Sequence, residues 1–203
     1  MGREIYFDVP QELDLKIEEY ALGFLRQGRK EWDEPHMRSV TFYVTEIARR
    51  EVLDVLVMRT TGRLHDIGYF GLFENADSKS YGNVMDKKAL HMINGAGLTK
   101  EFLERPEIKP FYTQEQIDRV VHLVSVHDKI EELKDEDEIA FMEADTLGAI
   151  DISRVKTTFN KEDGIRYIVN DIIIRRFPRF RTETGKKYLQ ELLPKFAAQF
   201  KDK

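Results

Sequence analysis

Apolar residues recur along most of the chain with the spacing that is typical of α-helices. Over residues 11–27 they form one stripe, with Pro10 near its start and Gly28 just past its end, as at the two ends of a helix. A second helical stretch begins around Pro35, and a third, which is the most apolar, covers residues 51–66. No segment has a clear strand pattern. The sequence therefore predicts an all-α fold.

The remainder of the chain continues this pattern on both sides of one irregular segment. Residues 69–86 are rich in glycine, asparagine and serine and have no clear period, so we expect a long loop there. A capping-box pattern at residues 113–116 predicts the start of another helix. The further helices are expected over residues 87–96, 99–105, 113–127, from the acidic turn at 131–137 to about 150, 161–175 and 183–200.

Composition places the chain among globular proteins. With 203 residues, of which 41% are hydrophobic, the chain is long enough to bury a core of its own. No apolar run approaches the roughly 20 residues of a membrane span. The first 14 residues carry acids and lack the apolar stretch of a secretory signal, and the absence of cysteine fits a reducing compartment. We therefore expect a cytoplasmic protein.

Cysteine content and net charge narrow the chemistry further. A chain without cysteine has no thiol catalysis, no disulfides, no thiolate zinc site and no iron–sulfur cluster. The formal net charge of −5 argues against a dedicated nucleic-acid surface, which is normally basic. One local basic patch remains open at four arginines: Arg175, Arg176, Arg179 and Arg181.

The chain contains five histidines, each in a helical segment next to apolar residues: His36, His65, His91, His122 and His127. A single histidine in such a place is more often a core or surface residue than a ligand. His122 and His127 are about 140° apart around their helix, and His127 is nearer to the apolar stripe. We therefore expect His127 to point inward and His122 to be solvated.

Two aspartates stand where burial is expected. Asp66 follows His65 at the end of the apolar third helix, and Asp145 shares a helix face with apolar residues. A buried carboxylate needs a partner, and a divalent cation is one. Without a metal, Asp66 would form an ion pair with Arg59 or Arg63, and Asp145 would be an N-cap or would pair with a buried arginine.

Several short motifs occur in a fixed order along residues 30–190. His36 begins HMRSV, His65 and Asp66 lie in LHDIG, and Asp145 lies in EADTL. His91 begins the pattern HxxxGA, His127 precedes the last aspartate, and residues 180–185 read FRTETG. In this order and context the motifs resemble those of the HD superfamily of metal-dependent phosphohydrolases, and the closest likeness is to its small stand-alone members.

The resemblance implies an all-helical domain that binds one or two divalent ions. By motif position the first ion is held by His36, His65, Asp66 and Asp145, with Asp66 and His65 as the catalytic pair. A second ion, or the substrate phosphate, is held by His91 and His127. We expect one helical domain over residues 1–203, with the motifs at about 30–155 and the helices of 156–203 packed on them.

The ligand types indicate which metal and which reaction to expect. Imidazole and carboxylate without thiolate favour Mn, Fe, Co, Ni or Zn over Mg, which prefers all-oxygen sites. Such an ion activates water and polarises a phosphate, so we predict hydrolysis of a phosphomonoester or phosphodiester, with a nucleotide as the first choice of substrate. Two other hypotheses remain: a metal or nucleotide sensor with little turnover, and a helical domain whose histidines are incidental.

Basic residues near the motifs are candidates to hold the substrate phosphate. Arg38, Lys87 and Lys88, together with Lys129, have the required charge, although each is also typical of a solvated helix face. The sequence leaves the choice between a monomer and a homodimer open.

Overall fold

The chain is all-helical, as its sequence predicts. The computed structural model describes residues 9–201 except residues 30 and 75, and this part contains no strand. Residues 1–8, on which the expectation about a secretory signal partly rests, lie outside it. None of the helices described is both long and apolar enough to cross a bilayer.

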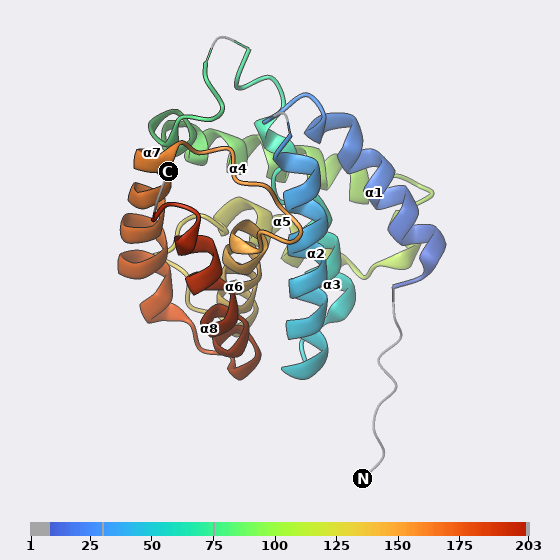
Figure 1. Cartoon of the computed structure of the whole chain (residues 1–203). Coiled ribbons are helices and arrows are strands. Elements are labelled where there is room, and N and C mark those ends of the chain that lie inside the picture. The colour runs from blue at the N-terminus through green and yellow to red at the C-terminus, as the bar shows by residue number, and fades with distance from the viewer. Residues whose placement is uncertain (1–8, 30, 75, 202–203) are drawn as a thin grey trace.

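Figure 1 shows the arrangement of the helices, with α2 and α6 near the centre and α1 and α7 towards opposite sides. α2 packs against α3 and α6, α4 packs against α5, and α8 packs against α6. The α-helices are α1 (Gln11–Leu25), α2 (Asp33–Arg50), α3 (Val55–Leu64), α4 (Tyr81–Leu103), α5 (Gln114–Val126), α6 (Glu136–Ile150), α7 (Lys161–Arg166) and α8 (Glu183–Ala198). The shorter elements are the 3-10 turns Ile67–Tyr69, Lys109–Phe111 and Phe177–Arg179, and the π-helix Tyr167–Arg176 that continues α7.

The prediction of two separate helices over 87–96 and 99–105 is wrong, because α4 runs unbroken from Tyr81 to Leu103. The predicted gap at residues 97–98 is absent, and α4 continues through Gly97. Gly95, inside the helix, is the point at which α4 crosses the turn after α3, where an added Cβ would lie 3.5 Å from the Gly68 nitrogen. The helix also starts earlier than expected, where the Tyr81 hydroxyl donates to Asp171 at 2.6 Å. The irregular segment is therefore shorter than the predicted loop over 69–86.

Other helix ends follow from local capping. Thr113 and Gln116 form the predicted capping box at the start of α5. The third helix begins at Val55 instead of residue 51, because the Asp54 carboxylate accepts a hydrogen bond from the Val57 nitrogen and so caps it there.

α2 and α6 cross each other closely at Gly148. A Cβ added to Gly148 would stand 2.5 Å from Cγ2 of Val40 and 2.9 Å from its backbone nitrogen, so only glycine fits at this position without movement. His36 on α2 and Asp145 on α6 each lie about one turn from this crossing. The spacing of the two helices therefore sets the distance between these two side chains.

We expect Gly148→Ala to lower the free energy of unfolding by roughly 1–3 kcal/mol, because the methyl group forces the two helices apart. Gly97→Ala is the matched control: its added Cβ meets no atom of the described chain within 4 Å, and alanine favours the helix by about 0.5–1 kcal/mol. Urea unfolding of both variants measures the difference. Equal stability of the two variants would contradict the close crossing.

Asp14 fixes α1 to α3. Its carboxylate lies 2.7 Å from Nη2 of Arg59 and 2.9 Å from Nη2 of Arg63. Burial alone would raise the pKa of Asp14, but the hydrogen bonds from the two arginines outweigh it and lower the pKa from 3.8 to about 2.

Asp14→Asn should therefore cost roughly 1 kcal/mol of stability at pH 7, after allowance for solvent screening. Because the pKa of Asp14 is lower in the folded than in the unfolded chain, its contribution is present above about pH 4 and is lost as the pH falls towards 2. Urea midpoints of the two proteins should converge over that range. Glu12→Gln, which removes an exposed partner of Lys16, should shift no midpoint.

Candidate metal centre

Five helical segments bring the predicted ligands to one place. His36 lies in the second turn of α2, His91 in the middle of α4 and Asp145 in α6. His65 and His127 are the C-caps of α3 and α5, and Asp66 follows His65 directly. All six side chains are at most 11% exposed. The structure therefore brings together every residue that the sequence assigned to the two metal positions.

Helix ends orient two of the histidines. Nδ1 of His65 lies 3.1 Å from the Gly62 carbonyl, and Nδ1 of His127 lies 2.9 Å from the Val124 carbonyl. A carbonyl only accepts, so Nδ1 donates in both rings and Nε2 faces the cluster. Nε2 of His65 is buried and has no hydrogen-bond partner among the described residues. A buried imidazole nitrogen without a hydrogen-bond partner is what a histidine metal ligand presents to its ion.

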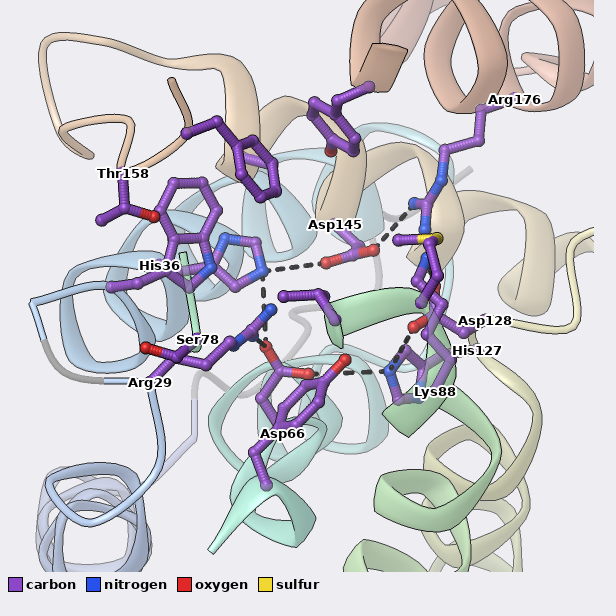
Figure 2. A pocket seen from close by; sticks show the side chains of 17 residues that line it. Arg29, His36, Asp66, Ser78, Lys88, His127, Asp128, Asp145, Thr158 and Arg176 are labelled. Atoms are coloured by element: carbon purple, nitrogen blue, oxygen red, sulfur yellow. Dashed lines mark hydrogen bonds and ion pairs between the residues drawn. The ribbon is translucent and has the colours of Figure 1, made fainter. Parts of the chain in front are cut away.

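The first set of donor atoms consists of the four side chains predicted for the first ion. Nε2 of His36 lies 3.0 Å from Oδ1 of Asp145 and 3.6 Å from Oδ2 of Asp66. Nε2 of His65 lies 3.2 Å from the same Asp66 oxygen and 3.7 Å from the same Asp145 oxygen. Figure 2 shows the Asp145 carboxylate between His36 on one side and Arg176 on the other.

The second set shares Asp66 with the first. Oδ1 of Asp66, the oxygen that does not face His36, lies 3.6 Å from Nε2 of His91 and 3.8 Å from Nε2 of His127. The two imidazole nitrogens are 3.1 Å apart. One carboxylate thus faces both sets, with one oxygen for each.

These distances fit divalent ions. Two ligands that each lie about 2.1 Å from a metal are about 3.0 Å apart at a right angle and about 3.4 Å apart at the tetrahedral angle. Both sets have edges of this length to within a few tenths of an ångström, and the donors of each triad, His36–His65–Asp66 and Asp66–His91–His127, lie within 4.8 Å of one another. The residues present therefore fit one ion in each set.

The carboxylates of the centre are strongly acidic. Burial would raise the pKa of Asp66, but His65 and Arg29 outweigh it and hold the pKa well below the usual value. Arg176 and His36 do the same for the pKa of Asp145. Both groups are therefore ionised, as a metal ligand must be.

The imidazoles of the centre respond to the same charges. Burial would lower the pKa of His65, but the Asp66 carboxylate raises it to about 9. Burial and the neighbouring His127 lower the pKa of His91 to about 3, so this ring is neutral at pH 7.

Three cationic side chains surround the carboxylates. Arg29 was not named by the sequence analysis, Arg176 was named only as part of a basic patch, and Lys88 was named as a phosphate ligand. Nη2 of Arg29 lies 2.5 Å from Asp66, and the Arg29 guanidinium covers the ring of Tyr69 at 4.0 Å. Nη1 of Arg176 lies 2.8 Å from Asp145, and Lys88 lies 2.9 Å from Asp128. The buried arginine pair that Asp145 could form without a metal is thus present, and it coexists with the histidine contact.

Three further arginines that the sequence placed near the site lie elsewhere. Arg59 and Arg63 bind Asp14 and do not contact Asp66. Arg38 pairs with Glu34 and Glu18, and it does not line the central cavity. Two residues after His36, it points about 200° away around α2, so the structure does not bring this predicted phosphate ligand to the metal ligands.

The remaining predicted cations divide in the same way. Lys88 lines the central cavity, whereas Lys87 and Lys129 are not among its walls. Of the four arginines of the predicted basic patch, Arg175 and Arg176 pair with carboxylates, whereas Arg179 and Arg181 donate to backbone carbonyls. His122 is 42% exposed beside Glu138, as expected of a solvated residue.

Glu143, the first residue of EADTL, connects two of the motifs. Its carboxylate accepts hydrogen bonds from the backbone nitrogens of Arg181 and Thr182, at 2.5 and 3.0 Å, and from the Thr182 hydroxyl. Thr182 in turn caps α8 through the Gly185 nitrogen. The buried carboxylate thus fixes the start of α8 against α6, two residues from Asp145.

A cavity of about 50 Å³ lies beside both donor sets. Its charged walls are Arg29, Asp66, Lys88, Asp128, Asp145 and Arg176, and its aromatic walls are Trp32, Tyr69, Phe159 and Tyr167. At roughly 10–15 Å³ for each water-sized group, it holds a few small groups.

Comparison with known families agrees with this geometry. The family model of the HD domain matches residues 35–155, more than half of the chain, and this stretch contains all six donor residues. The chain belongs to the HD domain family. HD domains are all-α, and the family consists in general of metal-dependent phosphohydrolases. No significant match was found among curated proteins or among solved structures.

Metal analysis tests the centre directly. Chelated protein that is reloaded with Mn²⁺ or Zn²⁺ and passed through gel filtration should retain metal, measured by plasma mass spectrometry. Asp66→Ala should lose the ions of both sets and Asp145→Ala that of the first, because each removes a charged ligand. His122→Ala, a histidine outside the cluster, should retain the wild-type amount. Full retention by Asp66→Ala would exclude this centre.

Proposed function

We propose that this HD domain hydrolyses a phosphomonoester or phosphodiester, with a nucleotide or a related small molecule as substrate. The observation that carries the proposal is the position of Asp66, whose two oxygens face two separate sets of imidazole and carboxylate donors. When bound there, a divalent ion lowers the pKa of a water molecule and polarises a phosphoryl oxygen. Asp66, which borders the cavity, then orients the attacking oxygen, and His65, the other member of the predicted catalytic pair, holds that carboxylate in place with its Nε2 3.2 Å away.

Cationic groups at the cavity supply the phosphate contacts. Lys88 is only 15% exposed and presents its ammonium group beside Asp128, and Arg29 and Arg176 lie on other walls. Charge-assisted hydrogen bonds from such groups favour a phosphoryl group over a neutral ester. The indole nitrogen of Trp32 is a further donor, because it is buried and has no acceptor within the described chain.

The size of the cavity indicates how a substrate binds. A volume of about 50 Å³ accepts a phosphoryl group and not a nucleoside. The remainder of the substrate therefore extends past the walls formed by Ser78 and by Thr158 and Phe159. Trp32, Phe159 and Tyr167 offer aromatic surface at this side, which suits a nucleobase.

The functional unit extends beyond the part that matches the family. Arg176 follows the matched segment by about 20 residues, yet it binds Asp145 and Asp128 in the centre. We therefore assign the helices after residue 155 to the same domain.

Protein loaded with Mn²⁺, Co²⁺ or Ni²⁺ should release phosphate from an aryl phosphate or from a panel of nucleotides. Lys88→Met should lower kcat/KM by roughly tenfold or more, because one charge-assisted contact to the phosphate is lost. Lys87→Met is the matched control and should stay within about twofold, since Lys87 does not line the cavity.

Two results would count against hydrolysis. A metal-loaded protein that turns over no phosphate ester, but binds a nucleotide tightly by calorimetry, is a sensor. Equal kinetics of the Lys87 and Lys88 variants would remove the assigned phosphate contact and leave the metal centre in place.

A further inference from the structure

The chain contains a second histidine–aspartate pair at a helix end. His127 and Asp128 follow α5 as His65 and Asp66 follow α3. The two histidines have nearly the same backbone angles, with φ −58° and ψ −37° at His65 and φ −55° and ψ −27° at His127. In both rings Nδ1 is tied to the carbonyl three residues earlier. The two helix ends therefore present a histidine and an aspartate in a similar way.

The Asp128 carboxylate faces two ways. Oδ1 accepts hydrogen bonds from Lys88 at 2.9 Å and from Arg176 at 2.6 Å. Oδ2 lies 3.7 Å from Nε2 of His91 and 3.9 Å from Nε2 of His127, and no hydrogen bond reaches it within the described part of the chain. The side chain is 7% exposed. Asp128 lines the central cavity, so its unused oxygen stands at that cavity beside two imidazole nitrogens, a set of donors that suits a cation.

We propose that Asp128 is a ligand of a second divalent transition-metal ion, which it holds together with His91, His127 and Oδ1 of Asp66. The inference rests on the metal centre of the proposed function and adds a residue to it. Each ion then has two histidines and two carboxylates, with Asp66 common to both. Figure 2 shows Asp128 next to His127 and Lys88 at the end of the site away from His36.

The charges of the site agree with two ions. The Asp33–Arg29 pair balances itself, and the carboxylates of Asp66, Asp128 and Asp145 face the cations Lys88 and Arg176. Two divalent ions leave three positive charges, which a hydroxide and a phosphate dianion neutralise. With a single ion the same substrate and hydroxide leave a net charge of minus two beside largely buried carboxylates, which is unfavourable.

The competing role for Asp128 is to position Lys88 and Arg176 without touching a metal. Asp128→Asn separates the two roles, because the amide oxygen still accepts from both cations but is a poor metal ligand. Lys88→Met is the matched control: it removes a cation that competes with the metal for the Asp128 carboxylate, and it leaves that carboxylate in place as a ligand.

The first experiment is a Mn²⁺ titration of metal-free protein, in which calorimetry measures binding and electron paramagnetic resonance records the signal of the bound ions. Wild type should bind two ions and give a spin-coupled signal. Asp128→Asn should bind the second ion at least about tenfold more weakly and give the signal of isolated Mn²⁺. Lys88→Met should keep two ions with equal or higher affinity.

A second experiment detects the ligand itself. The chain has no cysteine, so a thiolate placed at position 128 is the only one in the protein. Asp128→Cys loaded with Co²⁺ should show a thiolate-to-cobalt charge-transfer band in the near ultraviolet. Lys129→Cys, at the exposed neighbouring position, should show none.

The outcomes distinguish this inference from the proposed function. Two coupled ions in Asp128→Asn, or no charge-transfer band in a folded Asp128→Cys, would overturn the role of Asp128. A single ion in wild type with phosphate release intact would overturn the second ion and leave the hydrolase. No bound metal in wild type would overturn both.

Discussion

The cost of burying ionised carboxylates governs this structure. Asp66 and Asp145 lie in the middle of a helical core, where an unpaired charge is destabilised by several kcal/mol. The fold meets that cost with imidazoles from α2, α3, α4 and α5 and with the guanidinium groups of Arg29 and Arg176. The spacing of the helices around the site therefore depends on the contacts between their charged side chains as well as on apolar packing.

Much of the fold was evident from the sequence, because helix periodicity and local caps are short-range properties. The capping box at Thr113 and the start of α6 after an acidic turn were placed correctly. The break expected at residues 97–98 was not found, because α4 continues through Gly97. A glycine that ends a helix and a glycine that lies within one have the same local pattern.

The site was predictable to a similar degree, and for a similar reason. Histidines are few in this chain, so their order with Asp66 and Asp145 carries information. Charged residues make up 34% of the chain, so the choice of Arg29 and Arg176 among many arginines depends on contacts over 31 to 48 residues. Asp128 directly follows His127, which the sequence analysis named, but the same two residues could equally occur in an exposed turn. Only the packing of the helices distinguishes an aspartate at the site from one in an exposed turn.

The link from Glu143 to Arg181 and Thr182 has a consequence for recombination between relatives. α6 and the start of α8 share one buried carboxylate, and Arg176 in the intervening segment neutralises Asp145. A chimera with its junction near residue 155 would inherit the acidic half of both contacts from one parent and the matching half from the other. Functional exchange of the segment after residue 155 therefore requires that both parents keep an arginine and a capped helix start in register with these acids.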